Sequence, residues 1–181
     1  VNSSFEYFPG LPIHHSKDLV NWKLIGNGLH RPSQASSDVS LVTVQENGGI
    51  HAPTIRYNNG TFYIITTNMH NEIPNTNFII TAKDPAGPWS EPYVIENAPG
   101  IDPDLFFDDN GKVYFVGTHQ PGDMYKSGIG AIWVQELDLD NWELVGDRYS
   151  LWDGGCDKSH TEGPHIYKVN GIYYLLVAEG G

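Results

Sequence analysis

The chain has 181 residues, and its 22 acidic and 10 basic side chains give a formal net charge of −12 at pH 7. A phosphate backbone or an anionic membrane surface would repel such a chain, which argues against nucleic-acid and membrane partners. No apolar run reaches the length of a membrane-spanning helix. The single cysteine, Cys156, excludes an internal disulfide.

Helical periodicity is nearly absent from the chain. Short apolar and β-branched runs are separated by Gly, Pro and Asn, a pattern that predicts an all-β fold. The chain begins inside an apparently structured stretch, Val1 to Phe5, and ends directly after a strand-like run, Tyr173 to Val177. We therefore expect both ends to be cuts in a longer protein.

Two kinds of segment recur along the chain. The first contains an aspartate followed by a tryptophan and occupies residues 16–26, 84–89 and 137–146. The second begins with a polar residue and contains a proline, an Asn-Gly pair and a tyrosine. Its leading residues are His51, Asp102 and Glu162, and the glycines nine residues later are Gly60, Gly111 and Gly171. Because Asn-Gly favours a type I′ turn, each of these segments predicts a tight hairpin.

The repeat period, about 50 to 65 residues, is typical of four-stranded propeller blades. Residues 1–22 then form the outer part of one blade, two complete blades follow, and the chain ends with the inner hairpin of a fourth. An ordinary β-sandwich with similar hairpins is the alternative. The shared proline, Asn-Gly and tyrosine favour a partial β-propeller.

The leading residues carry the functional prediction. The first strand of each blade lines the central channel, so we expect His51, Asp102 and Glu162 to converge on one small volume. Carboxylates that lie close together shift each other's pKa values, and glycoside hydrolysis uses such a pair. Asp104 is expected on the same strand face as Asp102, because alternate residues of a strand point the same way. A turn role for Asp102 and a solvated strand end for Glu162 are the alternatives.

Longer motifs resemble glycoside hydrolase family 43, and within it the β-xylosidase branch that also contains α-L-arabinofuranosidases. The motifs are VNSSFEYFPGLPI at 1–13, HSKDLVNW at 15–22, APTIRY at 52–57, GIDP at 100–103 and EGPHIYK at 162–168. The resemblance implies an inverting enzyme with three acids on a five-bladed β-propeller. Residues 1–181 would cover roughly three of the five blades, lacking the first inner strand and the last blades.

The resemblance also implies roles for individual residues. Glu162 matches the general acid, and Asp102 matches the aspartate that orients this acid and tunes its pKa. The general base would be an aspartate ahead of Val1, so we expect the isolated chain to be inactive. Phe5 matches an aromatic residue of the sugar pocket. His51 stands where a bulky aromatic residue is common, and Asp104 where a small hydroxyl residue is common, so both are candidate substrate-binding residues.

The predicted reaction is removal of terminal xylose from β-1,4-xylo-oligosaccharides with inversion. An α-L-arabinofuranosidase acting on arabinosyl-substituted oligosaccharides, and a non-catalytic sugar-binding propeller, are the alternatives. No cofactor is required and no metal ligands are assigned. The resemblance allows a structural calcium ion in the channel of the full-length protein, and His165 is a candidate for holding water or an ion there. Asp108-Asp109-Asn110-Gly111 faintly resembles a calcium loop, but a hairpin turn explains it.

Overall fold

The computed structural model describes residues 1–36, 39–42, 44–70, 74–119, 130–155 and 160–180, so Cys156 lies outside the described residues. The described chain is built from strands and one short 3₁₀ turn, Pro32–Ala35, which confirms the all-β prediction. No helix in these residues is long and apolar enough to cross a membrane. The chain divides into two compact units, Val1–Val94 and Ile95–Gly181.

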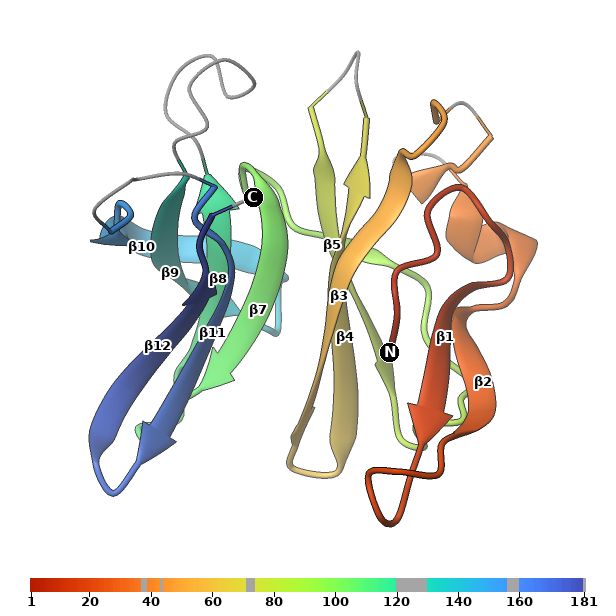
Figure 1. The fold of residues 1–181 in the computed structure, drawn as a ribbon, viewed down its shortest axis with the longest axis horizontal. Coiled ribbons are helices and arrows are strands. Elements are labelled where there is room, and N and C mark those ends of the chain that lie inside the picture. Colours follow the sequence, from red (N-terminus) through yellow and green to blue (C-terminus); the bar gives the residue numbers. More distant parts are fainter. Residues whose placement is uncertain (37–38, 43, 71–73, 120–129, 156–159, 181) are drawn as a thin grey trace. The chain divides into compact units, whose positions relative to one another are not determined.

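The first unit contains a two-stranded hairpin and a four-stranded antiparallel sheet (Figure 1). Its strands are β1 (Gly10–His15), β2 (Lys23–Leu29), β3 (Gly49–Asn58), β4 (Thr61–Met69), β5 (Thr76–Ala82) and β6 (Tyr93–Val94). Leu11 and Leu29 of the hairpin are fully buried in one cluster with Ile64 and Phe78 of the sheet. Burial of these apolar side chains joins the hairpin and the sheet into one core.

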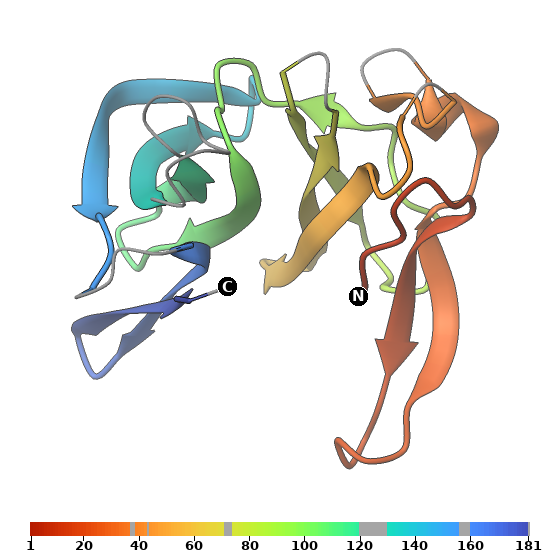
Figure 2. The same cartoon turned by 45° about the horizontal axis from the view of Figure 1, so that its top comes forward.

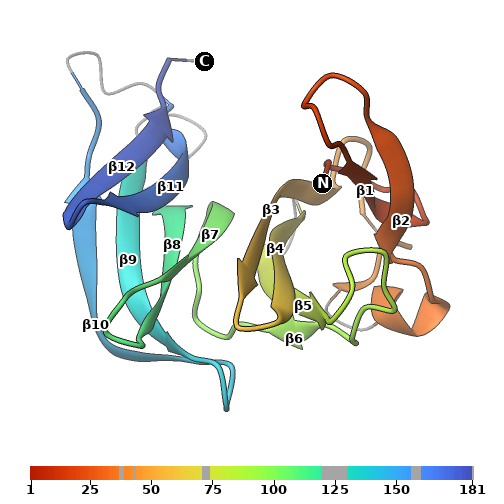
Figure 3. The same ribbon diagram turned by 90° about the horizontal axis from the view of Figure 1, so that it is seen from below.

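The second unit repeats this composition in the opposite order (Figure 2). Its four-stranded sheet comprises β7 (Ile101–Phe107), β8 (Val113–His119), β9 (Ala131–Asp138) and β10 (Glu143–Trp152), and its hairpin comprises β11 (Glu162–Val169) and β12 (Ile172–Ala178). Strand β11 packs against β7 and β8 (Figure 3). Ile166 and Leu175 of the hairpin cover a small core of Phe106, Val116 and Ile132. The described strands thus form two four-stranded sheets and two hairpins, in the order along the chain that the repeat predicts.

Each inner strand carries a β-bulge at its proline. The bulges lie between His51 and Thr54, between Ile101 and Asp104, and between Glu162 and His165. The residue before each proline is left-handed, with φ of 42° at Ala52, 54° at Asp102 and 59° at Gly163. The strands therefore correspond at their prolines. The predicted equivalence of Asp102 with His51 and Glu162 is wrong by one residue, since Asp102 corresponds to Ala52 and Gly163.

The hairpin turns explain this shift. Asn59-Gly60 and Asn170-Gly171 have positive φ at both residues, which confirms the type I′ prediction for two hairpins. In the β7–β8 hairpin only Gly111 of the pair is left-handed, with φ of 86°. The Gly111 N–H donates to the Asp108 carbonyl, and the Asp108 N–H donates to the Lys112 carbonyl, both at 3.0 Å. This turn holds one residue more, so counting back from its glycine misplaces the strand.

The recurring Asp–Trp segments form turns that the aspartate closes. The carboxylate accepts a hydrogen bond from the N–H two residues ahead in each segment. The bonds run from Val20 to Asp18 at 3.0 Å, from Ala86 to Asp84 at 2.8 Å and from Asp140 to Asp138 at 2.8 Å. A short acidic side chain that bonds its own backbone in this way stabilises a turn without further contacts.

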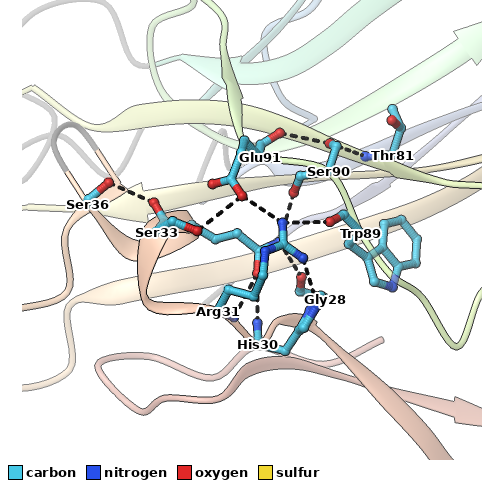
Figure 4. Close-up of polar contacts among 10 residues, drawn as sticks. Gly28, His30, Arg31, Ser33, Ser36, Thr81, Trp89, Ser90 and Glu91 are labelled. Carbon is cyan, nitrogen blue, oxygen red and sulfur yellow. Dashed lines mark hydrogen bonds and ion pairs between the residues drawn. The ribbon is translucent and has the colours of Figure 1, made fainter.

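A buried glutamine joins the segment after β2 to the segment before β6. Gln34 has no exposed surface, and its Oε1 accepts the N–H groups of His30 and Arg31, each at 2.9 Å. Its Nε2 donates to the carbonyls of Gly28 at 3.1 Å and Ser90 at 2.8 Å. Figure 4 shows the surrounding network, in which Arg31 also reaches the Trp89 carbonyl and the Glu91 carboxylate. The side-chain amide thus satisfies four backbone groups in the first unit.

Candidate active site

Two carboxylates, Asp102 and Glu162, come from neighbouring strands of the second unit. Asp102 lies near the start of β7, and Glu162 is the first residue of β11. Both residues are partly buried. The backbone N–H of Gly163 donates a 3.1 Å hydrogen bond to Oδ2 of Asp102. Since Gly163 directly follows Glu162, this bond fixes one acid beside the backbone that carries the other.

The bulge in β11 makes this hydrogen bond available. Glu162 pairs with Ala178 and His165 pairs with Leu176, so Gly163 and Pro164 lie inside the bulge. A bulged residue is released from the regular ladder, which leaves its N–H free to point elsewhere. In β11 the released N–H of Gly163 points to the carboxylate of Asp102.

The electrostatics of Asp102 reflect its surroundings. Burial and, after it, the charge of Glu162 raise the pKa of Asp102 to about 6, against the smaller opposing effects of the Gly163 N–H and of His165. A carboxyl group with this pKa is largely ionised at neutral pH but takes up a proton in mildly acidic solution. A carboxyl group whose pKa is raised by burial and by a neighbouring carboxylate is a common feature of catalytic sites.

Asp104 lies two residues further along β7 and is completely buried. Its Oδ1 accepts the Leu105 N–H at 2.8 Å. Its Oδ2 lies 3.4 Å from the Ile166 nitrogen and 3.3 Å from Nδ1 of His165. The expectation that Asp104 contacts a sugar needs correction, because a side chain without exposed surface does not reach a substrate. The bulge and the left-handed Asp102 break the strand alternation, which is why the two aspartates differ in exposure.

The other two candidate substrate-binding residues meet in the first unit. Phe5 pairs with Ile50 through an isolated β-bridge, and its ring meets the His51 ring edge-on, with centroids 4.9 Å apart. Phe5 is 39% exposed, and the Nε2 of His51 lies 2.9 Å from the Asn47 carbonyl oxygen. Partly exposed rings of this kind suit sugar stacking. The predicted convergence of His51 with the two acids concerns residues of different units and stays a prediction.

Sequence reasoning missed two contacts of the site. One joins the Gly163 N–H to Asp102, and the other joins Asp104 to His165. A signal for the first exists, because a glycine directly after a candidate catalytic acid indicates an unusual backbone conformation there. Nothing in the spacing of Asp104 and His165, which are 61 positions apart, indicates that they meet.

The described residues contain no group of three His, Cys, Asp or Glu side chains arranged to hold a metal ion. In the stretch from Asp108 to Gly111, the carboxylates have a lysine as their partner. The Nζ of Lys168 lies 2.7 Å from Asp108 and 3.0 Å from Asp109. These contacts agree with the hairpin interpretation of this segment. The calcium ion that the resemblance allows in the central channel stays a prediction.

Comparison with known proteins identifies the family. The model of glycosyl hydrolases family 43 matches residues 1–181. A xylosidase/arabinosidase of Butyrivibrio fibrisolvens is 54% identical over the whole chain, and a non-reducing end α-L-arabinofuranosidase of Bacteroides ovatus is 42% identical. The chain spans 34% and 32% of these two proteins.

Solved structures agree with this assignment. A family 43 subfamily 12 protein from a capybara gut metagenome has a TM-score of 0.87 at 45% identity, and a xylan β-1,4-xylosidase of Bacillus halodurans has a TM-score of 0.85 at 39% identity. Each match covers at least 99% of this chain and 34% of the solved chain. The fold is that of a partial β-propeller, and the chain belongs to glycosyl hydrolases family 43.

Proposed function

We propose that the enzyme containing this chain removes terminal xylose from β-1,4-xylo-oligosaccharides with inversion of configuration. The observation that carries the proposal is the pair of acids on β7 and β11, in which Asp102 is partly buried, senses the charge of Glu162 and is bound by the Gly163 N–H. Relatives named β-xylosidase, such as that of Bacillus subtilis at 36% identity, support the choice of sugar.

In this proposal Glu162 donates its proton to the glycosidic oxygen as the bond to the leaving group breaks. A water molecule attacks the anomeric carbon from the opposite face and gives its proton to the general base, the aspartate that the family resemblance places ahead of Val1. Inversion in one step requires about 6.5–9.5 Å between the acid and base carboxyl groups, which leaves room for the water.

Asp102 has a supporting role in this scheme. Its carboxylate is held by the Gly163 N–H, one residue from the acid, so its position and that of Glu162 are linked through the backbone. When Asp102 is ionised, its charge opposes a second negative charge nearby. In the proposal this is the contribution of Asp102, because a general acid must carry its proton before the bond breaks.

An α-L-arabinofuranosidase is the second candidate function. The observation that favours it is the name of two relatives, since the Butyrivibrio protein is called a xylosidase/arabinosidase and the Bacteroides protein an α-L-arabinofuranosidase. The same acids would serve both reactions. The choice of sugar would then depend on the pocket, to which Phe5 and His51 are the candidate contributors.

The test is hydrolysis of aryl β-xyloside and aryl α-L-arabinofuranoside by the full-length enzyme, with Glu162→Gln as the matched control. Xyloside cleavage that Glu162→Gln weakens, with α-xylose as the first product seen by NMR, is the expected result. Predominant arabinofuranoside cleavage selects the second candidate. No cleavage of either substrate by a folded enzyme would contradict both and favour a sugar-binding propeller.

A further inference from the structure

The buried carboxylate of Asp104 faces the imidazole of His165 across the boundary between β7 and β11. We infer that Asp104 is a positioning residue, which acts through His165 and the backbone of Ile166 to hold Glu162 in place beside Asp102. The inference rests on the proposed function for its effect on catalysis, whereas the contacts of Asp104 with His165 and Ile166 do not depend on that function.

The carboxylate of Asp104 is completely buried and has hydrogen-bond partners on two strands. Asp104 has no exposed surface, and a buried charge is costly unless hydrogen bonds and an opposite charge surround it. Its Oδ1 takes the N–H of the next residue, Leu105, within its own strand. Its Oδ2 is directed to β11, where the Ile166 nitrogen lies at 3.4 Å and the His165 Nδ1 at 3.3 Å. One oxygen thus serves its own strand and the other serves the neighbouring strand.

The imidazole of His165 faces Asp104 through its buried edge. The Nδ1 of His165 is buried and has no well-aligned hydrogen-bond acceptor among the described residues. The carboxylate oxygen of Asp104 lies 3.3 Å from this nitrogen, so the buried edge of the imidazole faces the buried carboxylate. The His165 side chain remains 34% exposed, so its other edge is open to solvent.

The contacts of Asp104 with His165 and Ile166 lie directly after the bulge that follows Glu162 on β11. On β11 the bulge that contains Gly163 separates Glu162 from His165. The Gly163 N–H is bound to Asp102 inside the bulge, and His165 and Ile166 face Asp104 directly after it. The backbone next to Glu162 is therefore attached to β7 at two successive points. Catalytic groups must be held within about 0.5 Å of their productive geometry, and attachment at two points provides such control.

The charged groups around the pair also connect it to the reaction. The charge of Glu162 raises the pKa of Asp102, and positive charge on His165 lowers it. Loss of the Asp104 carboxylate removes the group that orients His165. The change would therefore reach Asp102 and Glu162, although Asp104 contacts neither a substrate nor the reacting atoms.

The experiment compares Asp104→Ala, Asp104→Asn, His165→Gln and the double variant Asp104→Ala/His165→Gln in the full-length enzyme. Asp140→Asn, an exposed aspartate of the β9–β10 turn, is the control. We expect Asp104→Ala to lower kcat for xylobiose by about 10- to 100-fold, the effect of misplacing a reacting group by up to an ångström. KM should change by less than about twofold, because no substrate contact is lost.

The remaining variants separate positioning from simple destabilisation. Asp104→Asn keeps one of the two acceptor oxygens and should retain more activity than Asp104→Ala. The double variant should be no worse than the poorer single variant, because both changes remove one interaction. An unchanged kcat for Asp104→Ala, a raised KM with unchanged kcat, or fully additive losses that follow the fall in Tm would each overturn the inference.

A crystallographic comparison provides a readout that does not depend on activity. In the Asp104→Ala structure, the Glu162 carboxyl should move relative to Asp102 by about 0.5 Å or more. An unmoved Glu162 would overturn the positioning role. If the unaltered enzyme cleaves neither glycoside, the proposed function fails, and this structural comparison still decides whether Asp104 positions Glu162.

Discussion

The backbone N–H of Gly163 binds the side chain of Asp102 across two neighbouring inner strands, 61 residues apart in the sequence, at 3.1 Å. This bond forms because the bulge in β11 releases the N–H from the strand ladder and the left-handed glycine directs it. The geometry of the acid pair therefore depends on one glycine as well as on the acids themselves.

Gly163→Ala tests this dependence. A Cβ at this position would meet only Ala178, at 4.0 Å, so the cost comes from the φ of 59° and not from a collision. We expect a loss of about 1–2 kcal/mol in stability, the cost of a left-handed non-glycine residue. Relaxation of φ should also turn the N–H away from Asp102 and lower kcat.

Gly171→Ala is the matched control, because Gly171 has a φ of 78° and no atom within 4 Å of an added Cβ. Thermal unfolding should give similar shifts for the two variants, whereas kcat should fall only for Gly163→Ala. Equal kcat values in both variants would show that the Gly163 N–H has no part in the reaction.

Asp102→Asn should alter the pH dependence of stability. The pKa of Asp102 is raised from 3.8 in the unfolded chain to about 6 in the folded one. Between these values the folded protein binds more protons, so this group makes the protein less stable as the pH rises from about 4 to about 6. The total effect is about 2–3 kcal/mol. The asparagine variant should lack this loss and be the more stable protein at pH 7–8.

Denaturant unfolding of the full-length enzyme between pH 4 and pH 8 measures the difference, with Asp140→Asn as the control for a general change in charge. Equal stabilities of Asp102→Asn and the unaltered enzyme at pH 8 would contradict a raised pKa. The same variant should lose about 100- to 10,000-fold in activity if Asp102 assists the acid.

Glu162→Gln should have an effect that depends on the leaving group. A general acid matters most when the departing oxygen is a poor leaving group, as in a xylo-oligosaccharide, and least for an acidic nitrophenol. We expect kcat/KM for xylobiose to fall by about 100-fold or more, with a smaller fall for the nitrophenyl glycoside. Equal losses for both substrates would argue that Glu162 is not the proton donor.

Gln34→Leu tests the buried amide in the first unit. The change removes the partners of four backbone groups, at His30, Arg31, Gly28 and Ser90. Each buried backbone group left without a partner costs about 1–3 kcal/mol, although water and relaxation recover part of the sum. The apparent Tm should fall by several degrees, whereas the exposed Ser36→Ala should change it little. Similar melting curves for both variants would contradict the importance of the amide.

The sequence predicts the hairpins within each unit well because their turn chemistry is local. Asn59-Gly60 and Asn170-Gly171 specify their hairpins through backbone preferences of the two residues themselves, which do not depend on distant contacts. The same reasoning fails by one residue at Asp102, because the β7–β8 turn contains an extra residue and the bulges are invisible to a simple count. Alignment at Pro53, Pro103 and Pro164 gives the correct register.

The proximity of the two candidate acids is predictable from the sequence, whereas the contacts that support them are not. Asp102 and Glu162 stand out because carboxylates at strand starts are poor core residues. The burial of Asp104 and its contact with His165 depend on the packing of β11 against β7, which no local pattern encodes. The bond from Gln34 to the Ser90 carbonyl likewise joins two segments whose proximity only the folded chain shows.

The bulge gives every inner strand two adjacent places from which a side chain can be presented, the left-handed residue and the one before it. His51 and Glu162 occupy the earlier place in β3 and β11, and Asp102 occupies the later place in β7. Because the earlier place does not have the left-handed backbone of the later one, exchanging a residue there changes the side chain that a blade presents without changing its strand register.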